Sequence, residues 1–155
     1  MSLSSLELKV HPPLVAIITA LIMWGISLVT PVYPVSDAIR ISAAMAVALI
    51  GGGVSLAGII SFRRMKTTIN PVKPERASSL VVAGVYKITR NPMYVGILLV
   101  LVAWALFLSS HWALPGSLLF VLYINRFQIA PEERALDALF GSEYAAYKSR
   151  VRRWI

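Results

Sequence analysis

The sequence predicts an all-α integral membrane protein, a bundle of about four transmembrane helices followed by a cytoplasmic amphipathic helical tail. Composition is the first reason. Of the 155 residues, 57% are apolar and 14% are charged, and the mean hydropathy is +0.72, whereas soluble domains average about 25% charged residues. Clustering is the second reason, because the runs 10–36, 41–62 and 91–125 contain no charged residue. Each run exceeds the roughly 18 residues that indicate a membrane span. A soluble globular domain is excluded.

The first two predicted spans cover residues about 12–30 and 39–62. Pro31 ends the first span, and the short proline-containing link that follows predicts an antiparallel hairpin. The second span contains a run of glycines, in which Gly53 and Ala57 lie four residues apart on one helical face. Small residues at this spacing predict close packing against another helix.

The third uncharged run, 91–125, must fold back on itself. A single helix of 35 residues would be about 52 Å long, against a hydrocarbon core of about 30 Å. The turn is expected at residues 109–112, a polar cluster that is soon followed by Pro115, because no other part of the run combines polar and helix-breaking residues. This gives a third span of about 93–108 and a fourth of about 112–129.

Basic residues gather on one side of the predicted bundle. The loop 63–91 carries seven basic residues and one acidic residue, and the tail from Arg126 onward carries six basic and four acidic residues. By the positive-inside rule, both segments and the N-terminus are cytoplasmic, as in a multi-pass protein of the inner or plasma membrane if the source is bacterial. Contact with anionic membrane lipids then explains the net charge of +8 without a nucleic-acid partner. Within the loop, the pairs Asn70-Pro71 and Lys73-Pro74 predict a non-helical backbone.

The chain is predicted to be one membrane domain, 1–155, whose last part is the helical tail 131–155. Pro131 is typical of a first helical position, and acidic residues follow it in the first turn. Gly141 is expected to stop this helix. A second short helix would then gather its apolar side chains on one side, as suits the membrane interface. These side chains are Tyr144, Tyr147 and Val151.

The residue types that the sequence lacks exclude several kinds of site. With no cysteine, the chain forms no disulfide, thiol nucleophile or Cys-ligated metal site. Its two histidines, His11 and His111, lie at opposite ends of the predicted spans, so no metal site or Ser-His-Asp triad is expected. Polar residues beyond those that topology requires gather in two segments, 78–96 and 125–134. Because both meet the same cytoplasmic membrane surface, they are the candidate site.

Three charged residues of the second segment invite specific interpretations. Arg126 directly follows an uncharged span, so it either reaches the lipid headgroups or faces the bundle as the partner of an anion. Glu132 and Glu133 are neighbours on a predicted helix and therefore point about 100° apart. They are expected to serve different roles rather than to share one proton.

Two motifs carry a resemblance to a known family. The stretches GVYKITRNPMYVG, residues 84–96, and EERALDALFGSEYAAYKSRVRRWI, residues 132–155, resemble the isoprenylcysteine carboxyl methyltransferase and phospholipid methyltransferase superfamily. Its pattern is roughly G-x-Y-x-x-x-R-H-P-x-Y-x-G followed by E-E and F-G-x-E-Y-x-x-Y. The resemblance implies a membrane methyltransferase that uses S-adenosyl-L-methionine and takes a lipid, a lipidated molecule or another lipophilic acceptor from the bilayer.

The resemblance also implies roles for individual residues. It assigns Arg126 to the substrate, and Glu133 is a conceivable base for an amine acceptor. No metal ligand is implied. Asn91 stands where the family has histidine, so a mechanism with an imidazole base at that position is excluded. The residues expected to bind the cofactor are Ser79, Leu80, Val81, Tyr86, Asn91, Pro92, Tyr94 and Glu132.

Several alternatives stay open at this point. The acceptor is a prenylated protein, phosphatidylethanolamine, or a small lipophilic thiol, carboxylate or amine. A related fold also occurs in membrane sterol reductases, which predicts NADPH in place of S-adenosylmethionine. A third alternative is a membrane scaffold or lipid-binding protein without catalysis, in which the motif residues affect stability only.

Overall fold

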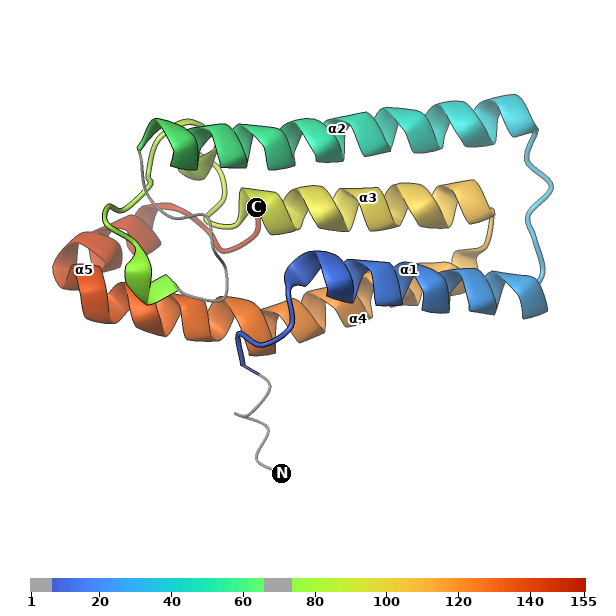
Figure 1. Ribbon diagram of the computed structural model, residues 1–155. Helices are drawn as coiled ribbons and strands as arrows, with labels where there is room; N and C mark the ends of the chain where they lie inside the picture. Colours follow the sequence, from blue (N-terminus) through green and yellow to red (C-terminus); the bar gives the residue numbers. More distant parts are fainter. Residues whose placement is uncertain (1–6, 66–73) are drawn as a thin grey trace.

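The computed structural model describes residues 7–65 and 74–155, and these form an all-helical bundle (Figure 1). The helices run alongside one another, and the C-terminal helix bends at one end of the bundle. The stretches Pro12–Val29, Asp37–Arg64 and His111–Arg150 are long and apolar enough to cross a membrane, and Pro92–Leu108 is a shorter apolar helix. The predicted fold class is therefore confirmed. The helices are α1 (Pro12–Val29), α2 (Asp37–Arg64), α3 (Pro92–Leu108), α4 (Leu114–Ile124) and α5 (Ala130–Arg150).

The helices start and end close to the predicted limits of the spans. The predictions for Asn70-Pro71 and Lys73 lie outside the described residues. Large apolar side chains cover the outside of the bundle; Leu28 is 67% exposed and Leu49 is 73% exposed. Exposed apolar surface of this extent is typical of a face that contacts lipid rather than water.

Helices α2 and α3 pack closely because glycines lie between them. Gly51 of α2 faces Gly96 of α3, and a Cβ atom on Gly96 would overlap the Gly51 carbonyl oxygen and the Ser55 side chain. Close packing of the second span is confirmed, but the predicted face is wrong. A Cβ atom on Gly53 would meet no atom within 4 Å, because Gly53 lies two residues from Gly51 and so on another side of the helix.

Replacing Gly96 with alanine is expected to destabilise the bundle by about 1–3 kcal/mol, the usual cost of overpacking. The midpoint of thermal unfolding in detergent should therefore fall by several degrees. Gly53→Ala is the matched control, because the added methyl group enters open space and alanine favours a helix by up to about 1 kcal/mol over glycine. Equal midpoints for the two variants would contradict this packing.

The turn predicted at 109–112 is confirmed. Helix α3 ends at Leu108, Ser109 has the left-handed backbone of a helix end (φ 50°), and α4 starts again at Leu114 after a short 3-10 turn. Helix α1 packs on α3 and α4, while α2 packs along α3. Over their described residues α1 and α2 make almost no contact with each other. The predicted hairpin therefore connects the two helices, but they do not pack against each other.

Helices α4 and α5 form one continuous stretch through a π-helical turn, Asn125–Ile129. Pro131 lies in the first turn of α5, as predicted, but α5 continues directly from the π turn and is not a separate helix. Proline has no N–H to donate to the Phe127 carbonyl four residues earlier, and the Leu8 N–H donates to that carbonyl instead, at 3.0 Å. The wider π turn takes up the proline without ending the helix.

The tail bends at Gly141, as predicted. Its backbone there is non-helical (φ 46°, ψ −117°), so α5 consists of two helical segments. The second segment does not turn its apolar face to the membrane interface. Tyr144 and Tyr147 are buried against Leu80, and the tail is held by the Arg90 N–H, which donates to the Arg152 carbonyl at 3.0 Å. An apolar face of this kind suits contact either with the membrane interface or with other parts of the protein. Here the 78–91 segment buries it.

Candidate active site

A pocket lies at the end of the bundle where α2 ends, α3 begins and α5 bends. It has about 830 Å³ of space between protein atoms, part of which is open to solvent. Its wall consists of Phe62, Pro74, Ala77, Ser79, Leu80, Val81, Tyr86, Arg90, Asn91, Met93, Tyr94, Glu132, Glu133, Leu136, Tyr144 and Tyr147.

A buried carboxylate lies on one side of this pocket. Glu132, on α5 beyond the apolar run, accepts hydrogen bonds at its Oε1 atom from the Tyr94 hydroxyl and from Gln128 Nε2, each at 2.6 Å. The π turn contributes here, because it carries Gln128 on the face that Glu132 shares. Burial raises the pKa of Glu132 to about 7, although both hydrogen bonds act in the opposite direction. A positively charged ligand group would stabilise its ionised form.

A guanidinium group in the same pocket wall has only part of its hydrogen-bonding capacity satisfied. Arg90 forms an ion pair with Glu133 through Nη2, at 3.0 Å. Its Nε and Nη1 atoms are buried and have no hydrogen-bond partner among the described residues. Buried N–H groups without a partner are costly, so each one calls for an explanation such as a missing ligand. Carboxylate and phosphate groups are suitable acceptors for such an arginine, because their charged oxygens accept charge-assisted hydrogen bonds.

Glu133 is held from two sides. Besides Arg90, it accepts hydrogen bonds from Arg153 Nε at 3.0 Å and from Arg153 Nη2 at 2.6 Å. Glu132 and Glu133 thus serve different partners, as their adjacent positions on a helix predict. Proton transfer to Glu133 would have to break one of these ion pairs.

Aromatic and apolar side chains form the rest of the wall. The Phe62 and Tyr86 rings meet edge to face at 5.4 Å. The Tyr147 hydroxyl donates to the Tyr86 carbonyl at 2.7 Å, which ties the tail to the wall. Burial raises the pKa of Tyr147 to about 12 and raises the pKa values of Tyr86 and Tyr144 further above the ordinary tyrosine value. These phenols stay neutral at physiological pH and supply ring faces and hydroxyl groups rather than charge.

The structure brings most of the predicted cofactor residues together around this one pocket. Pro92 is the exception, because it is buried at the start of α3 and does not reach the wall. Of the two predicted catalytic residues, Glu133 lines the pocket. The predicted residues in the wall are Ser79, Leu80, Val81, Tyr86, Asn91, Tyr94, Glu132 and Glu133.

Arg126 lies outside the pocket. Its Nη1 atom contacts Glu7 Oε1 at 2.5 Å, and Glu7 also pairs with Arg134. The Arg126 side chain is 49% exposed. The two alternatives for this residue were the headgroup region and the bundle interior, and its exposure favours the first. Its predicted role toward the substrate stays a prediction.

Asn91 joins the wall to the C-terminal residues. Its Nδ2 atom donates to the Arg153 carbonyl at 2.9 Å, and its backbone N–H donates to the Thr89 hydroxyl at 3.1 Å. The amide therefore fixes the tail through hydrogen bonding alone. Among the described residues, no group of three histidine or carboxylate side chains is placed to hold a metal ion.

Sequence reasoning did not assign several residues of the wall. Arg90 lies within the first motif and Tyr144 and Tyr147 lie within the second, so motif spacing was the signal that could have found them. Phe62 and Met93 belong to apolar spans and carry no such signal. Only the packing of α2 against α3 places them at the pocket.

Replacing Tyr147 with phenylalanine is expected to loosen the tail. The buried Tyr86 carbonyl would lose its 2.7 Å hydrogen bond, at a cost of about 1–3 kcal/mol. The thermal midpoint should fall, and amide hydrogen exchange in the second segment of α5 should become faster. Tyr33→Phe is the control, since Tyr33 is 57% exposed. Unchanged exchange in Tyr147→Phe would show that this bond does not hold the tail.

Comparison with known proteins adds the family. A family model described as phospholipid methyltransferase matches residues 39–143, which include the pocket wall up to Leu136. A protein of Haemophilus influenzae (strain Rd), described only as uncharacterized, is 51% identical over 63 residues. These make up 41% of this chain and 100% of that protein. No solved structure matches the chain significantly.

Proposed function

Because the chain belongs to the phospholipid methyltransferase family, we propose that this membrane methyltransferase binds S-adenosylmethionine in the pocket between α2, α3 and α5. The observation that carries this proposal is the pairing of opposite charges in the wall. The buried carboxylate of Glu132 and the partly unsatisfied guanidinium of Arg90 line the same pocket. An amino-acid moiety offers an ammonium group to the first and a carboxylate to the second.

The remaining wall suits the rest of such a ligand. Apolar side chains such as Leu80 and Val81, and the ring of Phe62, provide a surface for an adenine ring. Tyrosine faces favour a neighbouring cation, such as a sulfonium, by about 0.5–2 kcal/mol. When bound, S-adenosylmethionine supplies a methyl group on positively charged sulfur, which a nucleophile can take without metal or redox chemistry.

The chain's own contribution to such a transfer is position and exclusion of water. Glu132 and Arg90 hold the two charged ends, and the tail closes the site through Tyr147 and Asn91. When the acceptor is already nucleophilic, alignment of the reactants supplies much of the reduction in the activation barrier for methyl transfer. For an amine acceptor one proton must leave, and Glu133 stays the candidate base, provided that Arg90 or Arg153 first releases it.

We place the pocket at the cytoplasmic membrane surface and treat α1, α2, α3 and α4 as the spans. The family favours a lipid acceptor, and the loop and tail carry the basic residues that the positive-inside rule assigns to the cytoplasm. A half-exposed Arg126 at this level would contact lipid phosphates, in keeping with its predicted role toward the substrate.

The reductase alternative receives less support. NADPH carries several phosphate groups, but Arg90 is the one basic residue among the described residues of the wall, where two carboxylates also lie. Such a wall repels phosphates more than it attracts them. A scaffold without catalysis gives no role to the Nε and Nη1 atoms of Arg90, which have no hydrogen-bond partner in the part of the chain that the structure describes.

Methyl transfer can be tested directly with S-adenosylmethionine that carries tritium in its methyl group. The purified protein is reconstituted into vesicles of phosphatidylethanolamine and phosphatidylcholine, and the organic extract is counted. We expect label in the lipid fraction, lost in Glu132→Ala and kept in Glu143→Ala, whose side chain is exposed on the same helix. Absence of labelled product from this and from a panel of lipophilic thiols, carboxylates and amines would contradict the proposal.

A further inference from the structure

A second hollow lies along the apolar part of the bundle, between α1 and α2 and with α3 as its floor. It exists because α1 and α2 make almost no contact over their described residues, while each packs on α3 or a neighbour. Every residue that lines it is apolar, and many are alanines, such as Ala16 on α1 and Ala48 on α2. We call it the α1–α2 groove. It has about 960 Å³ of space between protein atoms and is open on one side.

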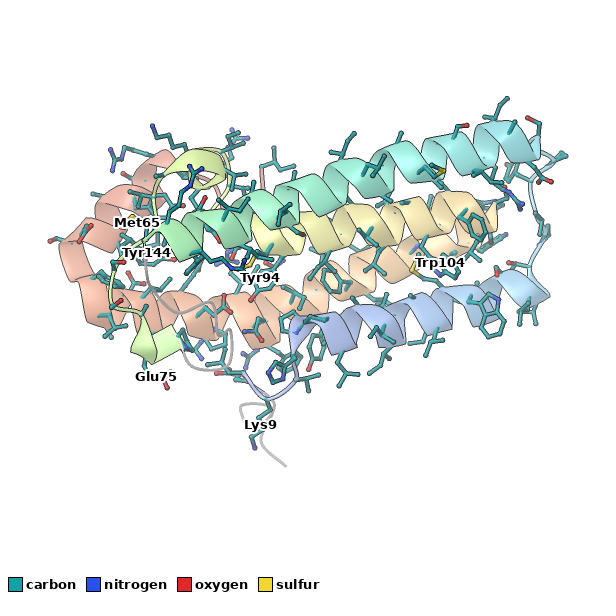
Figure 2. The ribbon with its side chains drawn as sticks, turned by 45° about the horizontal axis from the view of Figure 1, so that its top comes forward. Lys9, Met65, Glu75, Tyr94, Trp104 and Tyr144 are labelled. Atoms are coloured by element: carbon teal, nitrogen blue, oxygen red, sulfur yellow. The ribbon has the colours of Figure 1, made fainter. Side chains whose placement is uncertain are left out.

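The groove and the pocket lie on one face of α3. Met93 lines the pocket, and Ile97, Val100, Trp104 and Phe107 line the groove. The spacing of these five residues alternates between four and three, which is the repeat of a single helical face. Figure 2 shows Tyr94 of the pocket near the α5 end of α3 and Trp104 farther along towards the opposite end.

The depth of the groove identifies the chemistry of its occupant. At 1.5 Å per residue, Ile97 lies about 7 Å and Phe107 about 22 Å from the start of α3, within a hydrocarbon core about 30 Å thick. An occupant at these depths is hydrocarbon, because polar groups are costly there. The groove also has fixed limits. Trp104 Nε1 donates to the Ala20 carbonyl at 3.0 Å, joining α3 to α1, and the Arg40 guanidinium lies over the Phe107 ring at 5.4 Å.

We propose that the α1–α2 groove holds the long hydrocarbon chain of the methyl acceptor, whose reactive head lies in the pocket at the start of α3. This rests on the proposed function and adds to the pocket a separate binding site for the apolar part of the acceptor. A partner helix fits less well, because it would cross the whole hydrocarbon core of about 30 Å, whereas the α3 lining from Ile97 to Phe107 is about 15 Å long. A hydrocarbon chain that continues from the pocket into the groove explains why both lie on one face of α3.

The occupant can be identified with a phosphatidylethanolamine that carries a photoreactive diazirine in the distal half of one acyl chain. The protein is placed in phosphatidylcholine nanodiscs with a small fraction of this lipid, irradiated and mapped by mass spectrometry. We expect adducts concentrated on 97–107 of α3 and on the α1 residues of the groove, and competed by unlabelled phosphatidylethanolamine. Even labelling of all outward faces, such as that around Leu49, would overturn the proposal.

Two variants fill the groove from different sides. Ala48→Phe fills it from the α2 wall, and Met45→Trp fills it from a side chain that is 58% exposed and so leaves the core intact. Both should abolish the competed labelling. Leu49→Phe is the matched control, since Leu49 is 73% exposed and lies outside the groove, and it should label as the parent does. Unchanged labelling in both filled variants would refute the assignment.

Binding of S-adenosylmethionine to the same variants separates the two proposals. Because Ala48 and Met45 lie outside the pocket, both filled variants should keep the affinity of the parent protein. Competed labelling without any S-adenosylmethionine binding would overturn the methyltransferase site and leave a lipid groove. Cofactor binding with uniform labelling would overturn the groove alone. A parent dimer that Ala48→Phe converts to a monomer, without competed labelling, would assign the groove to a second copy and refute the lipid tail.

Discussion

Glu132→Gln is expected to lower the affinity for S-adenosylmethionine about 10- to 100-fold. A hydrogen bond to a charged group contributes about 1.5–3 kcal/mol, and each 1.4 kcal/mol is a tenfold change in affinity. Glutamine keeps an oxygen that can accept from Tyr94 and Gln128, which now bind Glu132 at 2.6 Å. The variant therefore removes the charge and preserves the local geometry. Titration calorimetry measures the change, with Glu143→Gln as the control for an exposed glutamate on the same helix.

The pH dependence follows from the pKa of about 7 that burial gives Glu132. S-adenosylmethionine binds the ionised form, so its affinity should rise between pH 6 and 8 in the parent protein and stay flat in Glu132→Gln. Stability of the ligand-free protein should change in the opposite direction. The folded state holds this proton more tightly than the unfolded state, so the resulting stabilisation is complete below pH 4.5 and is lost as the pH rises through about 7.

At pH 8, ligand-free Glu132→Gln should then melt at a higher temperature than the parent protein, and at pH 5 the two should agree more closely. A parent protein whose affinity and melting temperature do not change between pH 6 and 8 would show that Glu132 is already ionised in the folded state. The carboxylate would then need a cationic partner outside the contacts described here.

Arg90→Met is expected to produce a loss of similar size, about 10- to 100-fold in affinity for S-adenosylmethionine, because it removes a charged donor from a buried site. It also removes the 3.0 Å ion pair with Glu133, although Arg153 still holds that carboxylate. Lys87→Met is the control for loss of an exposed positive charge from the same segment. Arg90→Lys should give an intermediate loss, since lysine lacks the planar fork of arginine.

Decarboxylated S-adenosylmethionine distinguishes ligand contact from a structural role for Arg90. The parent protein should strongly prefer the carboxylated form, and Arg90→Met should bind the two forms about equally. If the variant still prefers the carboxylated form by the parent's factor, Arg90 does not contact the carboxylate and acts only through Glu133.

The sequence was a good guide to the fold for a physical reason. Charges are excluded from the hydrocarbon core, so the uncharged runs mark the helices. The third run is too long for one span, which indicates the turn at 109–112. Packing was harder to predict. Gly53 and Gly51 look equivalent in a run of three glycines, and only the position of α3 decides that Gly51 is the one in contact.

The candidate site was predictable where its residues belong to motifs, and less so where tertiary contacts decide. Tyr94 and Glu132 come from separate motifs and meet at 2.6 Å. The family resemblance assigns Arg126 to the substrate, but Arg126 does not line the pocket. Arg126 lies within the π turn, which changes the helical register before Glu132, and Glu7, more than a hundred residues away, pairs with Arg126. Neither effect has a sequence pattern of its own.

Calorimetric titration of the detergent-purified protein with S-adenosylmethionine, S-adenosylhomocysteine and NADPH tests the central claim most directly. We predict saturable binding of the first two, loss of that binding in Glu132→Ala and its weakening in Tyr94→Phe, and no binding of NADPH. If the folded parent protein, in detergent and again in lipid nanodiscs, binds neither adenosyl ligand, or binds NADPH instead, the pocket is not a methyl-donor site and the proposed function is wrong.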